Sequence, residues 1–513
     1  GGTGTHQRVV ISANGKNGVR IEGATTINNR VEGCYIGTNP EGTASPWGIT
    51  DWSNGWHGVS IWQGGSNYIY NNLIADNGWS GVAVDYAVKD DVRNNRIGVD
   101  VSGNPLGNGF YGVHIAHGAM PIVSYNTIAF NGRGIHVEGG SSPWIEYNMI
   151  YGHNASAASL SYQGRGGGIL VDASSPVIAG NLIADNVAYT GTDKTGYGGG
   201  IYLLNANNAV ISENLVVDNA ANTAGAGMGG GICIDGTASG LVVQANQVLS
   251  NAASLASATG WGGGIAGGPD GALIQGNLIE GNQGNSVGAG QGAGLFQWYG
   301  SAEYRNNLVR GNRGSYAVYL GHSRSRFEGN LVVDNSTGTG VSLEYGYSGG
   351  GPILVNNVVA RSATSNRATL HVYASSGAPL AATLLHNTLV GQGTGYGVWV
   401  EGYVTLTLTN TLIVSHTWGI TVTLPASSTV SADHTLFWAN AGTAITGTDP
   451  VFGDPRFLPD GYHLGPGSAA IDAGADAGVA TDIDGDTRPV GAGYDIGADE
   501  ARFLYLPLVL RNY

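Results

Sequence analysis

One hexapeptide recurs in this chain at widely separated positions. NLIADN stands at residues 72–77 and again at 181–186, and the variant NLVVDN stands at 214–219 and 330–335. Aligning the chain on the first Asn of this segment gives thirteen copies, which follow one another at intervals of 22 to 33 residues. A repeat with a period of about 20 to 50 residues is typical of solenoids and propellers. The chain is therefore expected to consist of many copies of one small structural unit.

A second set of short segments runs in phase with the first. Gly precedes alternating aliphatic residues in segments such as HGVSI, YGVHI and GGGIY. Segments of this length that alternate apolar and variable positions between Gly and Asn are typical of strands. A propeller blade requires four longer strands in about 40 residues, and intervals as short as 22 residues do not hold them. The pattern predicts an all-β chain, a right-handed parallel β-helix solenoid of about 14–15 coils whose Asn side chains stack from coil to coil.

The composition agrees with a turn-rich β fold and excludes one class of partner. Gly accounts for 88 of the 513 residues, and the chain has 21 basic and 36 acidic residues, which give a formal net charge of −15. Lys and Arg form no cluster, so nucleic acid is excluded as a partner. No apolar run reaches the roughly 18 residues that a membrane helix needs, so no transmembrane segment is expected.

The NxLIxxN and GIxV patterns resemble the repeat of right-handed β-helix proteins of the pectate-lyase-like superfamily. The resemblance covers about residues 8 to 440. The superfamily includes polysaccharide lyases, hydrolases, epimerases, adhesins and plain surface proteins. The resemblance therefore implies a fold and leaves the function open.

Residues 449–500 differ in character from the repeats. Their segments DPRF, GSAAIDAG, DIDGDTRP and YDIGADE resemble the choice-of-anchor Q segment found at the C-termini of secreted bacterial β-helix proteins. The resemblance implies an extracellular or cell-surface protein whose signal peptide has been removed, with a module that closes the C-terminal end of the helix. The expected division is a β-helix at 1–440, a capping module at 441–500 and an apolar tail at 501–513.

Three carboxylates in the segment DIDGDTRP suggest a metal site. Asp482, Asp484 and Asp486 stand at alternate positions around a Gly. A tight loop of this kind can surround Ca²⁺ with hard oxygen ligands, although the spacing is not that of an EF-hand. The alternative is a solvated turn in which Arg488 pairs with a neighbouring carboxylate.

Outward positions of the Gly-led strands suggest a carbohydrate-binding face. Two alternate residues of each strand are expected to point into solvent, forming stripes along the coils. Acidic and aromatic residues in such stripes suit a glycan, because rings stack on sugars and carboxylates hold hydroxyl groups. The expected binding residues are Trp62, Asp85, Tyr202, Asp235, Phe296 and Trp298.

A catalytic site is the alternative use of the same stripes. Glu138 and Asp172 are expected on neighbouring coils about 5 Å apart, near the carboxylate separation of retaining glycosidases, with His114 and His136 beside them. The contrasting interpretation is a charged surface that keeps the sheet soluble. The paired-Asp and Gly-His-Gly motifs of pectin hydrolases and the Asp-Pro-His motif of alginate epimerases are missing, and no His spacing indicates a metal site. These absences favour a protein that is not an enzyme.

The two ends of the chain suggest self-association. Coil-like sequence begins about eight residues after Gly1, so little chain remains to cover the edge of the first coil. The tail carries a short apolar run, and the predicted assembly residues are Phe503, Leu504, Tyr505, Leu506, Leu508, Val509 and Leu510. Head-to-tail contacts between such ends would produce filaments. A tail that folds back on its own coils is an equally consistent alternative.

The favoured interpretation is a secreted structural or adhesive protein of the cell surface, whose partners are further copies of itself or surface glycans. The alternative is an extracellular glycoside hydrolase or polysaccharide lyase that acts on a glycan bound along one sheet face. Apart from the Ca²⁺ suggested above, no cofactor is expected.

Overall fold

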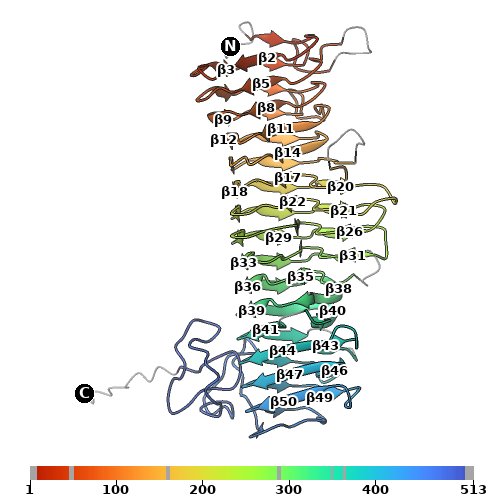
Figure 1. Ribbon diagram of the computed structural model, residues 1–513, viewed down its shortest axis with the longest axis vertical. Coiled ribbons are helices and arrows are strands. Elements are labelled where there is room, and N and C mark those ends of the chain that lie inside the picture. The colour runs from red at the N-terminus through yellow and green to blue at the C-terminus, as the bar shows by residue number, and fades with distance from the viewer. Residues whose placement is uncertain are drawn as a thin grey trace, which may run out of the picture. The chain divides into compact units, whose positions relative to one another are not determined.

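The computed structural model describes residues 8–44, 51–156, 162–285, 290–347, 350–361 and 366–502. These residues form strands, turns and loops, and no helix among them is long and apolar enough to cross a membrane. The chain divides into two compact units, one of Gly1–Leu320 with Asn335–Thr337 and one of Gly321–Asp334 with Gly338–Tyr513. Figure 1 follows the successive coils by colour, from red at the N-terminus to blue towards the C-terminus.

The coils of the first unit carry short strands on three faces. The first face consists of β2 (Val19–Glu22), β5 (Val59–Trp62), β8 (Val82–Asp85), β11 (Tyr111–Ala116), β14 (Arg133–Val137), β17 (Ile169–Asp172), β22 (Ile201–Leu204), β27 (Ile232–Asp235), β32 (Ile265–Ala266) and β35 (Leu295–Gly300). The second face consists of β3 (Arg30–Glu32), β6 (Tyr68–Tyr70), β9 (Val88–Arg93), β12 (Met120–Ser124), β15 (Trp144–Glu146), β18 (Val177–Ala179), β23 (Val210–Ser212), β28 (Val242–Gln244), β33 (Leu273–Gln275) and β36 (Glu303–Arg305). The third face consists of β1 (Val10–Ile11), β4 (Tyr35–Ile36), β7 (Leu73–Ile74), β10 (Arg96–Ile97), β13 (Thr127–Ala129), β16 (Met149–Tyr151), β19 (Leu182–Ala184), β24 (Leu215–Val217), β29 (Gln247–Leu249), β34 (Leu278–Glu280) and β37 (Leu308–Arg310).

Strands of the second unit repeat this arrangement. They are β39 (Arg326–Glu328), β41 (Ile353–Val355), β42 (Val358–Arg361), β43 (Ala368–Ala374), β44 (Leu380–Leu385), β45 (Thr388–Val390), β46 (Tyr396–Gly402), β47 (Val404–Thr409), β48 (Leu412–Val414), β49 (Trp418–Val422), β50 (Thr429–Asp433), β51 (Leu436–Trp438) and β52 (Val451–Phe452). Two longer strands, β38 (Arg313–Ser323) and β40 (Leu331–Glu344), contain residues of both units. Among the described residues, ten strands of the second-face type lie in the first unit and five lie in the second. The predicted all-β parallel solenoid and its number of coils are confirmed.

Aliphatic side chains in register fill the interior of each coil. Val59 on β5 pairs with Val82 on β8, and Ile61 pairs with Val84, in parallel register. All four side chains are fully buried. Each fully buried side chain of this size contributes about 1.5–3 kcal/mol of hydrophobic stabilisation, so the repeat is held mainly by its stacked core.

Two ladders of buried Asn side chains run along the corners of the first unit. In the first ladder, Nδ2 of Asn72 donates to Oδ1 of Asn95 at 3.0 Å. In the second ladder, Nδ2 of Asn77 donates to Oδ1 of Asn108 at 2.8 Å. The predicted amide stacking is therefore confirmed. The hexapeptide NLIADN begins in one ladder and ends in the other, which explains why both of its Asn residues recur.

The longer coils add strands outside the three faces. These strands are β20 (Val187–Tyr189), β25 (Ala220–Asn222), β30 (Ala252–Ser254), β21 (Gly196–Tyr197), β26 (Gly227–Met228) and β31 (Gly260–Trp261), and they form two three-stranded sheets. Met228 and Trp261 on these strands pack against first-face side chains, among them Tyr202 and Phe296. The inserted residues thus cover the part of the first face that lies beside them.

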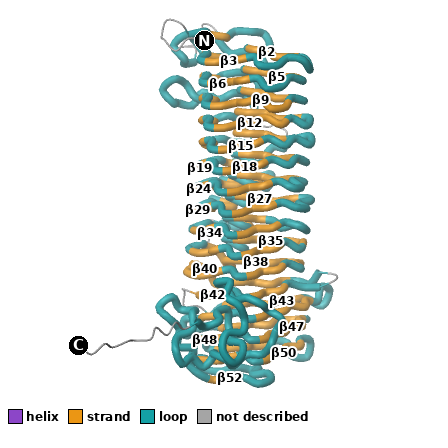
Figure 2. Tube along the Cα trace, turned by 90° about the vertical axis from the view of Figure 1, so that its left-hand side faces the viewer, coloured by secondary structure: helices purple, strands orange, loops and turns teal. Residues whose placement is uncertain are grey.

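The C-terminal module of the second unit lies along the side of the coils, beside β42, β48 and β52 (Figure 2). Asn356 donates to Thr481 O at 2.7 Å, and Asn410 donates to Ala475 O at 2.6 Å. Leu436 on β51 belongs to one hydrophobic cluster with Leu464 and Ile496 of the module. The segment that was expected to close the end of the helix packs along its side, because its polar and apolar contacts reach several coils.

Candidate functional site

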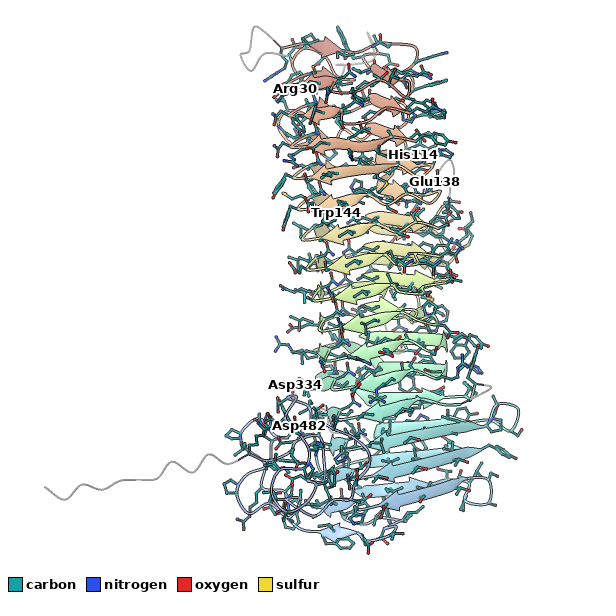
Figure 3. All side chains as sticks on the ribbon, turned by 60° about the vertical axis from the view of Figure 1, so that its left-hand side comes forward. Arg30, His114, Glu138, Trp144, Asp334 and Asp482 are labelled. Atoms are coloured by element: carbon teal, nitrogen blue, oxygen red, sulfur yellow. The ribbon has the colours of Figure 1, made fainter. Side chains whose placement is uncertain are left out.

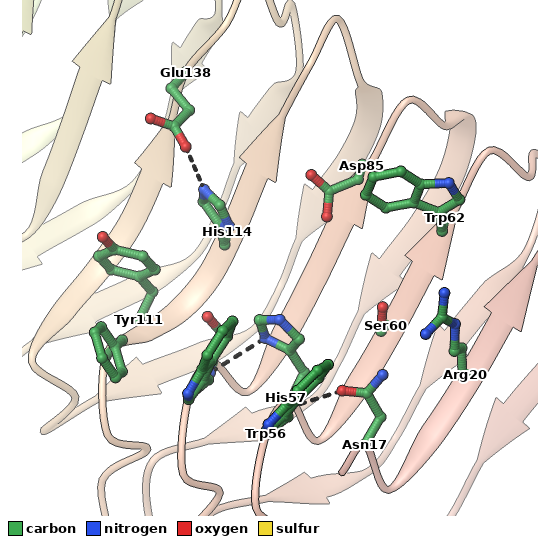
Figure 4. A pocket seen from close by; sticks show the side chains of 13 residues that line it. Asn17, Arg20, Trp56, His57, Ser60, Trp62, Asp85, Tyr111, His114 and Glu138 are labelled. Atoms are coloured by element: carbon green, nitrogen blue, oxygen red, sulfur yellow. Dashed lines mark hydrogen bonds and ion pairs between the residues drawn. The ribbon is translucent and has the colours of Figure 1, made fainter. Parts of the chain in front are cut away.

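A groove opens over the first face of the first unit, in its N-terminal coils (Figure 4). It has a volume of about 450 Å³ and is bordered by Asn17, Arg20, Trp56, His57, Ser60, Trp62, Trp79, Ser80, Asp85, Phe110, Tyr111, His114 and Glu138. Strand register places the side chains of its floor in two stripes. Arg20 pairs with Ser60 in one stripe, and Trp62 pairs with Asp85 in the other. The outward orientation predicted for Trp62 and Asp85 is confirmed, since both are only partly buried.

Aromatic rings from three successive coils form one wall of the groove. The rings of Trp56 and Trp79 stack with their centroids 5.2 Å apart, and Phe110 lies 6.0 Å from Trp79. Trp56 is 36% exposed and Trp79 is 45% exposed. We call these three residues the aromatic ladder. It presents partly overlapping rings to the groove as an apolar surface.

The second Asn ladder fixes the position of the aromatic ladder. Each ring follows an Asn-Gly pair, in the triplets NGW at 54–56, NGW at 77–79 and NGF at 108–110. A Cβ on Gly78 would lie 2.4 Å from the carbonyl oxygen of Gly55, so only Gly permits this stacking of the turns. The aromatic ladder was not predicted from the sequence, although the Asn-Gly-aromatic triplet is repeated there.

A second aromatic group borders the groove on the side of Trp62. The Trp62 ring lies 5.1 Å from Tyr86, and Tyr86 stacks on His117 at 4.6 Å. Nδ1 of His117 lies 3.0 Å from Oδ1 of Asp85. These contacts hold the Asp85 carboxylate at the edge of the floor.

One end of the groove holds a cluster of His114, His136 and Glu138. Nε2 of His114 lies 2.9 Å from Oε1 of Glu138, and Nε2 of His136 lies 3.6 Å from Oε2 of the same carboxylate. The rings of His114 and His136 stack with their centroids 5.3 Å apart. Figure 3 shows His114 and Glu138 close together on one side of the first unit, while Trp144 lies on another side. The structure thus brings together three of the four residues expected for a catalytic site.

Ionisation in this cluster follows from burial and hydrogen bonding. The hydrogen bond from His114 is the main reason that the pKa of Glu138 is lowered. Burial, followed by the charges of Arg133 and His114, lowers the pKa of His136 well below its usual value. Burial also lowers the pKa of His57 in the groove wall to about 4. At neutral pH, Glu138 is an ionised carboxylate and His136 is a neutral imidazole.

Asp172 and Glu138 have different hydrogen-bond partners. It accepts a hydrogen bond from the Tyr162 hydroxyl at 2.6 Å. A retaining glycosidase requires one protonated carboxylic acid beside one carboxylate. The lowered pKa of Glu138 does not suit that residue to the acid role.

Other expected binding residues are distributed differently. Tyr202 is fully buried and Phe296 is 5% exposed. The prediction that these two side chains point into solvent is wrong, because the inserted strands cover them. Asp235 accepts a hydrogen bond from the Tyr202 hydroxyl at 2.7 Å. Trp298 is 39% exposed and lies far along the chain from the groove.

The three carboxylates proposed for Ca²⁺ are each bound by different groups. Oδ1 of Asp482 accepts from the backbone N–H groups of Asp484 at 3.0 Å and Asp486 at 2.7 Å. Asp484 pairs with His463 at 2.6 Å, and Asp486 pairs with Arg502 at 2.8 Å. Asp482 therefore acts as a cap for its own loop, and calcium binding stays a prediction.

Arg488 does pair with a neighbouring carboxylate, as the alternative interpretation expected. Its Nη1 lies 2.8 Å from Oε2 of Glu500, and both side chains are fully buried. The assembly residues Phe503 to Leu510 lie outside the described residues.

No curated protein matches the sequence. Solved structures with a similar course of the chain include the periplasmic alginate epimerase AlgG, with 11% identity, 79% of this chain and 84% of that chain covered, and a TM-score of 0.31. The A-module of the Azotobacter vinelandii mannuronan C-5 epimerase AlgE4 has 12% identity, covers 71% of this chain and 89% of that chain, and has a TM-score of 0.26. A mutant tailspike protein of Escherichia coli bacteriophage HK620 in complex with a pentasaccharide has 10% identity, covers 84% of this chain and 71% of that chain, and has a TM-score of 0.29. These values are too low to transfer a function.

Two protein families match the sequence itself. Residues 3–166 match a family described as periplasmic copper-binding protein (NosD). Residues 98–279 and 259–413 match the family described as right handed beta helix region, which together cover more than half of the chain. The chain therefore belongs to the right-handed β-helix family.

Proposed function

We propose that this protein acts outside the cytoplasm, in the periplasm or at the cell surface, as an adhesive protein that binds a carbohydrate chain along the groove. The aromatic ladder of Trp56, Trp79 and Phe110 beside a polar floor is the observation that carries the proposal. The match of residues 3–166 to a periplasmic family supports the location.

The groove offers a glycan an apolar wall for its sugar rings and a polar floor for its hydroxyl groups. Exposed apolar surface with a polar border is typical of ligand-binding grooves. The ring centroids lie 5.2 and 6.0 Å apart from one coil to the next, so an extended sugar chain can contact a ring in each coil. Arg20, Ser60 and Asp85 on the floor offer donors and acceptors to the hydroxyl groups of the bound sugar.

Binding of the full chain to neutral and acidic polysaccharides tests the proposal by isothermal titration calorimetry. We expect Trp79→Ala to weaken binding at least tenfold, which corresponds to about 1.4 kcal/mol. The matched control is Trp144→Ala, since Trp144 is 55% exposed but lies on the second face, away from the groove. Equal affinities of the two variants would contradict the proposal.

The same samples separate adhesion from catalysis. An adhesive protein leaves the bound polysaccharide intact. Release of shortened or unsaturated fragments, abolished by Glu138→Gln, would instead support the alternative of a glycoside hydrolase or polysaccharide lyase.

We further propose that copies of the chain associate head to tail. Among the described residues, β1, β2 and β3 each pair with a strand on one side only, namely β4, β5 and β6. The outer edge of a terminal strand can accept a strand from another chain. The apolar tail at 503–510 supplies a segment able to do so.

A further inference from the structure

We propose that His114, His136 and Glu138 form a binding site for a divalent transition metal ion such as Zn²⁺ or Cu²⁺. One donor atom of each residue lies within 4.8 Å of the donor atoms of the other two. The site shares His114 and Glu138 with the end of the groove, but the case for it does not rest on the proposed glycan function.

The spacing of the donor atoms suits a single metal ion. Ligand atoms bound to a tetrahedral ion at about 2.1 Å lie about 3.4 Å apart. The separations of 2.9 Å between His114 and Glu138 and of 3.6 Å between His136 and Glu138 lie on either side of this value. Small side-chain rotations therefore convert the cluster into a ligand set.

His136 is the observation that distinguishes this cluster from an ordinary surface ion pair. Its side chain is 1% exposed, and neither ring nitrogen has a hydrogen-bond partner among the described residues. Leaving a buried polar group without a partner carries an energetic penalty. An ion bound to Nε2 removes this penalty at the nitrogen that already faces Glu138.

Neighbouring strands hold the ligands in place. His114 on β11 pairs with His136 on β14 in parallel register, and Glu138 directly follows β14. The stacked position of the two imidazoles is therefore set by the backbone. The two His residues are 22 positions apart in the sequence, which is no recognised metal-binding spacing, so the sequence did not reveal the site.

The chemistry of the donors selects the class of metal. Two imidazoles and one carboxylate favour Zn²⁺ or Cu²⁺ over Ca²⁺ or Mg²⁺, which prefer oxygen ligands. His114 and Glu138 have side chains that are 19% and 32% exposed, so the remaining coordination position opens towards the groove. A water molecule or a ligand oxygen can occupy that position.

Arg133 opposes the binding of a cation and limits the expected affinity. Its guanidinium group is fully buried behind the cluster, where it donates to Gly166 O at 2.9 Å and to Tyr162 O at 3.0 Å. The Glu138 carboxylate offsets this charge. We therefore expect affinity in the micromolar range, about −8 kcal/mol, rather than that of a structural zinc site.

Calorimetric titration of the metal-free full chain with Zn²⁺ and with Cu²⁺ tests the site. Glu138→Gln preserves the size of the side chain but removes its charge, and we expect it to weaken binding by more than the 10- to 100-fold typical of changes around a metal site. Glu146→Gln is the matched control, because Glu146 lies in the same coil on the second face. Thermal unfolding of each variant establishes that it is folded.

Electron paramagnetic resonance of the Cu²⁺-loaded protein gives a second readout. We expect hyperfine coupling to two imidazole nitrogens in the wild-type chain and to one in His114→Gln. The proposal is overturned if the wild-type chain binds neither ion, or if Glu138→Gln and Glu146→Gln bind equally well. Metal binding by a wild-type chain that binds no polysaccharide would support the metal site alone, and polysaccharide binding by a wild-type chain that binds neither ion would support only the glycan groove.

Discussion

Histidine illustrates how the surroundings of a single residue decide its role in this protein. His153 takes the place of an Asn in the second ladder, where its Nδ1 accepts from the Asn131 N–H at 3.0 Å. Burial lowers its pKa to about 4, so it remains neutral and serves as a hydrogen-bonding group. His463 in the C-terminal module lies between two carboxylates, Asp460 at 2.7 Å and Asp484 at 2.6 Å. Burial opposes its protonation, but these hydrogen bonds prevail and raise its pKa to about 9.

The raised pKa of His463 predicts a loss of stability at alkaline pH. Because the folded pKa of about 9 lies above the ordinary value of 6.5, the contribution of this residue is complete below pH 6.5 and disappears as the pH rises through 9. We expect the difference in melting temperature between the wild-type chain and His463→Gln to shrink from pH 6.5 to pH 10. A constant difference would contradict the assignment, and an NMR titration of the imidazole measures its pKa directly.

At the scale of the element, each coil is fastened to the next by its corners as much as by its strands. Strands of two to six residues supply most first-unit faces, and such short strands form few ladder hydrogen bonds. Asn95 compensates at one corner, because its Oδ1 accepts from the backbone N–H and the side chain of Asn72, each at 3.0 Å. Its Nδ2 donates to Ile69 O at 2.7 Å. The Asn side chain at the corner therefore forms hydrogen bonds with buried backbone groups beyond the ends of the strands.

Asn95→Ala is predicted to destabilise the N-terminal coils. It leaves the buried Asn72 N–H without its Oδ1 partner and removes the hydrogen bond to Ile69 O, and we expect a loss of about 1–3 kcal/mol. Asn94→Ala is the control, because Asn94 is exposed and Ala245 occupies the corresponding position, with a φ of 53° against 56° for Asn94. Urea denaturation and hydrogen exchange of the Asn72 amide measure the effect. Equal exchange rates in the two variants would refute the role given to the ladder.

The molecule combines a β-helix of repeated coils with a C-terminal module whose sequence does not follow the repeat. The buried ion pair of Arg488 and Glu500 lies within that module, and Arg488 also donates to Gly497 O at 2.9 Å and Ala498 O at 2.8 Å. Removing one partner of such a pair leaves an uncompensated buried charge. Loss of either side chain is therefore expected to destabilise the module.

Self-assembly is predicted to depend on the tail. A chain that ends at Arg502 keeps the bond from Ala501 N to Asp495 at 2.8 Å and the pair of Arg502 with Asp486, so the module should remain folded. We expect electron microscopy to show filaments of the full chain and single particles of the shortened chain. Single particles in both samples would eliminate head-to-tail assembly through the tail, and filaments in both would place the contact elsewhere.

Much of the fold was predictable because its information is local and repeated. The period, the Gly-led strands and the Asn at each corner predicted a parallel β-helix, its number of coils and the amide ladder. These features depend on residues a few positions apart, and each coil has the same arrangement of strands and corners. The outward orientation of Trp62 and Asp85 followed from strand alternation alone.

The site depended on contacts between coils, which spacing along the chain does not specify. His114 and Glu138 lie close together because β11 and β14 of successive coils pair in parallel register. The coil lengths of 22 to 33 residues do not specify that register. Tyr202 and Phe296 follow the same strand pattern as Trp62, yet inserted strands bury them. The sequence by itself determined which residues could face outward, because alternation within a strand is a property of the backbone. Only the tertiary structure decided which of them meet, which are covered and which form the groove, because those outcomes depend on loop length and on the neighbours that each coil receives.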